Sequence, residues 1–368
     1  METGLSQQAR LIHDRIAGQI RAQGAVTLAD FMRLALGARE IGYYTSRDPL
    51  GVAGDFTTAP EISQMFGEMI GLWCVDTWQR LGSPPQVHLV ELGPGRGTLM
   101  ADALRAAKLA PDFLAAIQLH LVEISAPLRA AQAQRLQAFG PHWHDGFESV
   151  PPGPLLIIAN EFFDALPIHQ FQLTEAGWRE RGVMLDPTDP TRFTWVLLPP
   201  GPQFALLPPM HRDAKPGDIV EISPASLRLA ALIGQRCQTE TGAALIIDYG
   251  VAASGFGDTF QALRQHRYHD PLTDVGDADL TAHVDLAALC RAGAAAGSRT
   301  FGPVPQGEFL CALGIDMRAQ MLIQGQPATI ASELTGGLHR LIDTDQMGNL
   351  FKVVAISSPS VTELAGFA

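Results

Sequence analysis

The sequence predicts an α/β fold, with a doubly wound and mostly parallel sheet, a helical segment before it and a β-hairpin region inserted into it. Between residues 87 and 248, short apolar runs alternate with helical stretches, as they do where crossover helices join parallel strands. Residues 168–222 instead alternate apolar and polar side chains around two Asp-Pro turns, which is typical of antiparallel hairpins. The expected core strands are the apolar runs 87–92, 119–124, 155–159, 244–248 and 350–356.

The composition favours a globular protein with a sizeable core. Of the 368 residues, 46% are hydrophobic and 17% are charged, and the net charge is −12. An acidic chain lacks the basic surface that nucleic acids and anionic membranes attract, so we expect no nucleic-acid binding. No apolar run reaches the roughly 18 residues of a membrane span, so we expect no membrane insertion. The scattered cysteines predict buried, reduced thiols rather than a zinc site or disulfides: Cys74, Cys237, Cys290 and Cys311.

In chain order, helical periodicity over residues 5–40 is followed by a polar, glycine-rich loop and by a second helical pattern from 61 to 81. A Gly-Ser-Pro-Pro sequence then ends the helix and precedes the first core strand. We therefore expect four segments: a helical N-terminal subdomain with an active-site loop at 1–82, a sheet core at 83–167 and 223–358, and a hairpin insertion at 168–222.

A glycine-rich segment follows the first core strand. Glu91 stands two residues before the pattern G-x-G-x-G formed by Gly93, Gly95 and Gly97. Glycines let the backbone approach a ligand closely, and the helix that follows presents its N-terminus to that ligand. A dinucleotide fingerprint would need a third glycine where Thr98 stands. The pattern resembles the first motif of class I S-adenosylmethionine-dependent methyltransferases, while another nucleotide-binding fold or a ligand-free turn remains open.

Acidic residues also end the next two expected strands. Glu123 closes the second apolar run, where a carboxylate can accept both hydroxyls of a cofactor ribose. The alternative is that Glu123 is exposed or caps a helix. Asp145 falls where a third strand should end, and we expect it near the adenine of such a cofactor.

The expected core strand at 155–159, the fourth when the short strand before Asp145 is counted, is followed at once by polar residues. Asn160, Glu161 and Asp164 emerge at the carboxyl edge, where doubly wound sheets bind ligands. Two carboxylates three residues apart could hold one cationic group between them. The alternative is that these acids only cap the next helix.

Six segments of the chain, taken together and in order, resemble the MidA-type methyltransferases, some of whose mitochondrial members help to assemble respiratory complex I. The segments are GDFTTAPE at 54–61, ELGPGRGTLM at 91–100, NEFFDALP at 160–167, DLTAHVD at 279–285, QGEFL at 306–310 and QMGNLFK at 346–352. The resemblance runs from about residue 40 to 356. It implies a class I (Rossmann-like) methyltransferase sheet and S-adenosylmethionine as the cofactor.

The mitochondrial members are described as protein arginine methyltransferases that make symmetric dimethylarginine on the quinone-site subunit of complex I. The resemblance therefore implies a protein substrate, with that subunit or its equivalent as the candidate. Because a guanidinium stays protonated at any physiological pH and is a poor nucleophile, we expect Glu161 and Asp164, with Asn160, to orient it and help it lose a proton. No mitochondrial transit peptide is evident, so we expect a cytoplasmic protein if the source is bacterial. Three alternatives remain open: a non-catalytic assembly factor, a methyltransferase of another acceptor, and a nicotinamide dehydrogenase.

Two further regions are candidates for the substrate side of the site. Tyr44 and the stretch containing Asp55, Phe56 and Glu61 could fold over the cofactor as a lid, or simply pack on the sheet. His283 ends a segment rich in His and Asp, 266–285, whose spacing matches no common metal site. We expect a loop near the active site there, without a metal ion.

Overall fold

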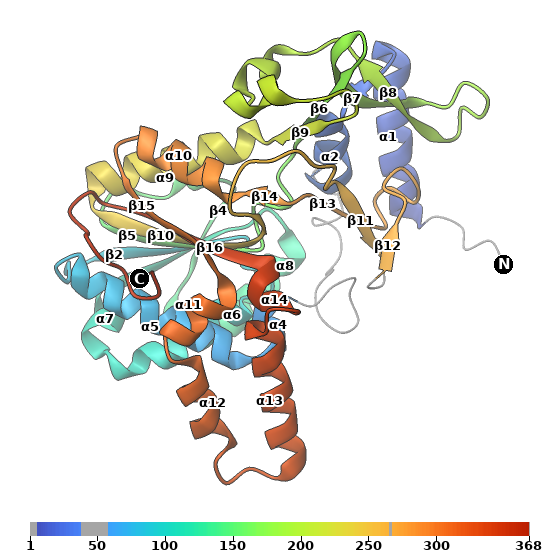
Figure 1. The fold of residues 1–368 in the computed structure, drawn as a ribbon. Helices are drawn as coiled ribbons and strands as arrows, with labels where there is room; N and C mark the ends of the chain where they lie inside the picture. Colours follow the sequence, from blue (N-terminus) through green and yellow to red (C-terminus); the bar gives the residue numbers. More distant parts are fainter. Residues whose placement is uncertain (1–5, 38–57, 265–266, 368) are drawn as a thin grey trace. The chain divides into compact units, whose positions relative to one another are not determined.

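The computed structural model describes residues 6–37, 58–264 and 267–367, which fall into two compact units (Figure 1). Unit 1 comprises Met1–Phe56, Asp164–Arg228 and Ala253–Asp285, and unit 2 comprises Thr57–Phe163, Leu229–Ala252 and Leu286–Ala368. The units group residues differently from the expected segments. The helix expected in the N-terminal subdomain at 61–81 falls in unit 2, because its apolar side chains pack into the core beneath the sheet.

Unit 2 is built on a sheet with the strand order β15-β16-β10-β5-β2-β3-β4. The strands from β4 to β10 are parallel, and β16 runs antiparallel to both of its neighbours. Their bounds are β2 Val87–Leu92, β3 Ile117–Val122, β4 His142–His144, β5 Leu155–Asn160, β10 Gly242–Val251, β15 Arg299–Pro305 and β16 Phe351–Ser357. The chain leaves β2 toward β4 and then returns to β5. The order therefore reverses between β2 and β5, which is where doubly wound sheets bind ligands.

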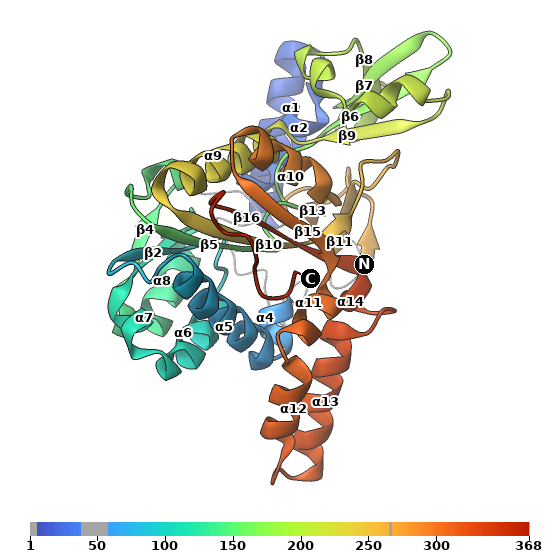
Figure 2. The ribbon, with the colours of Figure 1, turned by 60° about the vertical axis from the view of Figure 1, so that its left-hand side comes forward.

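Helices cover both faces of this sheet, with α5, α6 and α7 on one face and α9 and α10 on the other (Figures 1 and 2). Helices α5 and α6 approach closely because Gly71 has no side chain: a Cβ there would lie 2.4 Å from the carbonyl oxygen of Ala103. The bounds are α4 Ala59–Ile62, α5 Gln64–Arg80, α6 Thr98–Ala106, α7 Pro111–Ala116, α8 Ala126–Arg135, α9 Pro224–Glu240, α10 Leu286–Ala295, α11 Gln306–Ala312, α12 Ile315–Ile323, α13 Ala328–Ile342 and α14 Met347–Leu350.

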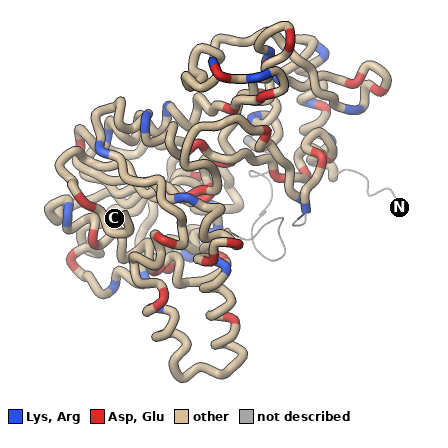
Figure 3. The backbone as a smooth tube through the Cα atoms, in the orientation of Figure 1, with Lys and Arg blue, Asp and Glu red and all other residues tan. Residues whose placement is uncertain are grey.

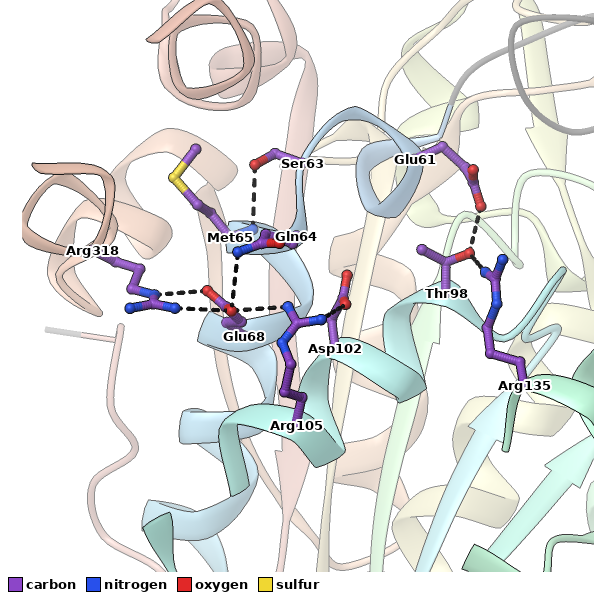
Figure 4. Close-up of polar contacts among 10 residues, drawn as sticks. All are labelled: Glu61, Ser63, Gln64, Met65, Glu68, Thr98, Asp102, Arg105, Arg135 and Arg318. Atoms are coloured by element: carbon purple, nitrogen blue, oxygen red, sulfur yellow. Dashed lines mark hydrogen bonds and ion pairs between the residues drawn. The ribbon is translucent and has the colours of Figure 1, made fainter. Parts of the chain in front are cut away.

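Helices α12 and α13 form an antiparallel pair that projects from the sheet (Figure 2). A buried carboxylate anchors its base: Glu68 on α5 accepts from Nε of Arg318 at 2.7 Å and from Nη2 of Arg105 at 2.9 Å (Figure 4). Two cations on one buried acid hold the pKa of Glu68 below its usual range, although burial opposes this. The far part of the pair, residues 319–332, contains no Asp, Glu, Lys or Arg (Figure 3).

Unit 1 contains the expected antiparallel hairpins and the helical addition. Its main sheet has the order β1-β7-β6-β9, with β8 paired to β7. Helices α1 and α2 bury Ile16 and Phe31 in one cluster with Val183 of β7. A smaller sheet has the order β12-β11-β13. The bounds are α1 Gln7–Gln23, β1 Val26–Thr27, α2 Leu28–Gly37, β6 His169–Thr174, β7 Gly177–Leu185, β8 Phe193–Leu198, β9 Ile219–Ile222, β11 Gln261–Arg264, β12 Arg267–His269 and β13 Asp279–Thr281.

Two acids of the 266–285 segment make structural contacts within unit 1. Asp277 accepts the backbone N–H and the hydroxyl of Ser6 at the start of α1, and Asp274 pairs with Arg264. Among the described residues, no group of three or more His, Cys, Asp or Glu side chains could hold a metal ion. No described helix is long and apolar enough to cross a bilayer. The four cysteines are free, and Cys311 is exposed, contrary to the expectation that all four are buried.

Candidate active site

The glycine loop after β2 depends on left-handed backbone that only glycine adopts without strain. Gly93, Gly95 and Gly97 have φ values of 62°, 53° and 77°. A Cβ on Gly93 would lie 2.8 Å from the ring of Phe162, and Gly97 stands immediately before α6. The loop therefore turns from β2 directly into the N-terminus of a helix, where backbone N–H groups favour an anionic group of a ligand.

Glu61 on α4 contacts this loop (Figure 4). The hydroxyl of Thr98 donates to Oε1 of Glu61 at 2.6 Å and accepts from Arg135. Nη1 of Arg96 lies 3.8 Å from Oε2 of the same carboxylate. Glu61, predicted as a lid residue, thus contacts the glycine loop through a hydrogen bond and an ion pair. The other predicted lid residues, Tyr44, Asp55 and Phe56, lie outside the described residues.

Glu91 is a buried acid at the carboxyl end of β2. Its side chain has an exposed fraction of 3%, and Oε2 has no hydrogen-bond partner among the described residues. Burial, together with the negative charge of Glu123, raises the pKa of Glu91 to about 8. A buried acceptor without a donor is rare and calls for a ligand or a water molecule. A cationic ligand group would both donate to Glu91 and favour its ionised form.

Glu123 and Asp145 follow β3 and β4. One oxygen of Glu123 accepts the N–H of Ser125 at 2.8 Å, so this oxygen caps the start of α8, and Nε2 of Gln132 lies 3.4 Å from the other. Burial raises the pKa of Glu123. The capping alternative is therefore realised at Oε1. Asp145 is largely exposed and pairs with Arg129 at 2.7 Å.

Three histidines link β2, β3 and β4 in a row that ends beside these acids. Nδ1 of His88 lies 2.9 Å from Nε2 of His120, and Nδ1 of His120 lies 2.9 Å from Nε2 of His144. His120 is buried, and burial together with the neighbouring imidazoles lowers its pKa to about 4. The carbonyl of His144 accepts the N–H of Glu123 at 3.0 Å. The row of histidines therefore contacts the backbone of Glu123, the residue predicted to bind the cofactor ribose.

Asn160 and Glu161 lie at the end of β5 in a strained turn. Glu161 has a φ of 50°, and its Oε1 accepts the N–H of Ala59 at 3.0 Å and Nδ2 of Asn160 at 3.1 Å. Oδ1 of Asn160 is buried and has no hydrogen-bond partner among the described residues. Unit 2 thus brings Asn160 and Glu161 to the same sheet edge as Glu91.

Asp164 and His283, by contrast, belong to unit 1. Asp164 is buried, and its carbonyl accepts the N–H of Ala282 at 3.1 Å. The N–H of His283 donates to Oγ1 of Thr259 at 2.9 Å, and burial lowers the pKa of this histidine.

Sequence reasoning missed Asp248 on β10. Its side chain is fully buried and accepts the N–H groups of Phe162 and Phe163, which directly follow Glu161. The available signal was the same one that identified Asn160, namely a polar residue at the end of a fully apolar strand.

The reversal of strand order at the glycine loop, the antiparallel β16 and the acids at the carboxyl edge define a class I methyltransferase. The chain belongs to the family described as putative S-adenosyl-L-methionine-dependent methyltransferases, whose sequence model matches residues 69–304. This confirms the cofactor and the methyltransferase class that the motifs predicted.

Known relatives extend the match to nearly the whole chain. A protein of Xenopus tropicalis named mitochondrial protein arginine methyltransferase NDUFAF7 is 37% identical, over 99% of this chain and 90% of that protein. Its Drosophila melanogaster homolog is also 37% identical, over 95% and 86%. A crystal structure of a Burkholderia thailandensis protein bound to S-adenosyl-homocysteine has a TM-score of 0.83 and 25% identity, over 98% of this chain and 94% of that one.

Proposed function

We propose that this chain transfers the methyl group of S-adenosylmethionine to a guanidinium nitrogen of an arginine in a protein. The observation that carries this proposal is a pair of buried acceptor atoms to which no described residue donates, Oε2 of Glu91 and Oδ1 of Asn160. Glu91 pairs in register with Ile158, and Asn160 shares a face of β5 with Ile158, so both side chains leave the same face of the sheet. The choice of arginine as the methyl acceptor rests on the relatives, which are named protein arginine methyltransferases.

The residues of unit 2 fit the parts of this cofactor. Glu91 suits its cationic groups, Oε2 of Glu123 suits a ribose hydroxyl, and the N-terminus of α6 suits its carboxylate. Asp145, which follows β4, remains the residue predicted to lie near the adenine. When bound, the cofactor supplies a methyl group on a sulfonium, which is an electrophile.

The acceptor must present a nitrogen lone pair and then lose a proton. In the proposed arrangement, Oδ1 of Asn160 accepts one N–H of the guanidinium, and the carboxylate of Glu161 accepts another. The C–S bond of the donor breaks as the N–C bond forms, and the proton released from nitrogen passes to a carboxylate or to water. Asp164 remains the predicted second carboxylate.

The proposed acceptor is the quinone-site subunit of complex I or its equivalent, in the cytoplasm if the source is bacterial. The test is to incubate the purified chain with trideuteromethyl S-adenosylmethionine and this subunit, and to locate labelled methyl groups by peptide mass spectrometry. We expect label on arginine, and none from Gly95→Val, whose branched side chain would enter a left-handed position of the loop. Label on another residue type would indicate a different acceptor. A chain that does not bind the cofactor at all would favour the alternative of a non-catalytic assembly factor.

A further inference from the structure

The turn that carries Asn160 and Glu161 is held by its surroundings rather than by its own sequence. Glu161 is in the left-handed region, which residues with a Cβ rarely adopt and which persists only where neighbouring contacts impose it. The N–H of Glu161 donates to the carbonyl of Ile247 at 2.9 Å. Two residues after Asn160, the ring of Phe162 lies against Gly93 of the glycine loop. The turn therefore also contacts the glycine loop.

Asp248 on the neighbouring strand β10 supplies further contacts to the turn. Its Oδ2 accepts the N–H of Phe163 at 2.9 Å and that of Phe162 at 3.2 Å, and its Oδ1 accepts the N–H of Tyr249 at 3.0 Å. Ile247 pairs in register with Asn160, so Asp248 stands one residue beyond the end of β5, level with the turn. A single buried carboxyl group thus satisfies two consecutive N–H groups of the turn and one of its own strand.

We propose that Asp248 is a positioning residue for methyl transfer, acting through the backbone N–H groups of Phe162 and Phe163. It sets the direction in which Asn160 and Glu161 face the acceptor, and it keeps the ring of Phe162 against Gly93. The inference rests on the proposed function of the site. A shift of about 1 Å in a reacting group can cost on the order of 100-fold in rate, so a residue that never touches the acceptor can still control turnover.

The direct test is Asp248→Asn, which has nearly the same shape but replaces one acceptor oxygen with a donor. Whichever way the amide turns, its NH2 group faces an N–H donor: those of Phe162 and Phe163 in one orientation, which costs the turn both hydrogen bonds, or that of Tyr249 in the other, which costs the adjoining strand one. We expect kcat to fall roughly 10- to 100-fold, with the Kd for S-adenosylmethionine and the circular dichroism spectrum nearly unchanged. Asp186→Asn is the matched control, because Oδ1 of Asp186 also accepts two successive N–H groups, those of Thr188 and Asp189, in a turn of unit 1.

A second measurement does not depend on turnover. Amide hydrogen exchange should show Phe162 and Phe163 strongly protected in the wild type and exchanging much faster in Asp248→Asn, while Leu245 in the middle of β10 stays protected. A double-mutant cycle with Asn160→Ala should show that the two changes together cost less than the product of their separate effects, because both act on one acceptor contact.

Three results would overturn the role of Asp248. They are unchanged protection of the two amides in Asp248→Asn, an unchanged kcat in that folded variant, or a loss of cofactor affinity as large as the loss of rate. If the wild type and Asp186→Asn both fail to methylate arginine, the proposed function fails instead, and the exchange data still decide whether Asp248 holds the turn.

Discussion

Replacing Glu91 with Gln should stabilise the cofactor-free protein at alkaline pH and weaken cofactor binding. The carboxyl of Glu91 has an ordinary pKa of 4.5 and a pKa of about 8 in the fold, where burial and the charge of Glu123 oppose ionisation. The folded state therefore holds this proton more tightly than the unfolded state does. The stability that the bound proton contributes is complete below pH 4.5 and is lost as the pH rises through 8.

The size of the effect follows from the same two values. At 1.36 kcal/mol for each pH unit, the interval from 4.5 to about 8 corresponds to roughly 5 kcal/mol, an upper limit because relaxation and water entry reduce it. Gln is neutral at every pH and nearly the same size, so it avoids this loss. We expect the variant to exceed the wild type by about 2–4 kcal/mol in free energy of unfolding at pH 9, and to match it near pH 5.

Cofactor affinity should change in the opposite direction. A hydrogen bond to a charged group contributes about 1.5–3 kcal/mol, so the Kd of Glu91→Gln should rise roughly 10- to 100-fold. Wild-type binding near neutral pH should release a proton from Glu91, which calorimetry in buffers of different ionisation enthalpy detects, and the variant should release none. If S-adenosyl-homocysteine, which lacks the sulfonium charge, loses as much affinity as the methyl donor, Glu91 contacts the ammonium group.

Urea denaturation at pH 5, 7 and 9 tests the predicted stability difference, and titration with S-adenosylmethionine and S-adenosyl-homocysteine tests the predicted change in Kd. A variant that is no more stable than the wild type at pH 9 would show that Glu91 is not an uncompensated buried acid. An unchanged Kd in a folded variant would remove Glu91 from the cofactor site.

Three other predictions can be checked with the same preparations. The pKa of His120 falls from 6.5 to about 4 in the fold, so the stability that neutral His120 contributes is present above pH 6.5 and is lost as the pH falls through 4. Over this interval the free energy of unfolding of the wild type should drop by up to roughly 3 kcal/mol. That of His120→Gln should drop less, which urea midpoints at several pH values would report. Glu123→Ala should weaken cofactor binding by about 1.5–3 kcal/mol in calorimetry, and an unchanged Kd would leave Glu123 as a helix cap only. Glu161→Gln should slow methyl transfer by roughly tenfold to a thousandfold with little change in cofactor affinity, and full arginine methylation by this variant would contradict its role.

The sequence predicted the strands whose two faces are both buried. Residues 87–92 coincide with β2, and the run 155–159 ends one residue before β5 does, because central parallel strands read as continuous apolar segments. The edge strands carry no such signal. β4 has only three residues and no apolar run, so the sequence located it only through the expected position of Asp145, and β15 contains Gly302 and Pro303, which do not read as a strand.

Part of the site depends on contacts that no local pattern reveals. The left-handed Glu161 and its bond to Ala59 join residues about a hundred positions apart, and Asp248 contacts the turn from 85 residues further along the chain. The glycine spacing, in contrast, predicts its own conformation, because three left-handed positions within five residues require glycine whatever packs around them. Motifs that work through backbone geometry can therefore be read from sequence, whereas those that work through tertiary hydrogen bonds cannot.

The two acids predicted for the cofactor side, Glu91 and Glu123, differ in the hydrogen-bond donors that the described residues offer them. Glu123 accepts the N–H of Ser125 and a longer contact from Gln132, which favour its ionised form against burial. Oε2 of Glu91 has no hydrogen-bond partner among the described residues, and Glu91 lies within reach of the charge of Glu123, so it is the acid that takes up the proton. A neutral ligand could satisfy the hydrogen bond of Glu91 but would leave this repulsion in place. A cationic donor such as an ammonium group would relieve both, so we expect Glu91 to bind a positively charged group of the cofactor.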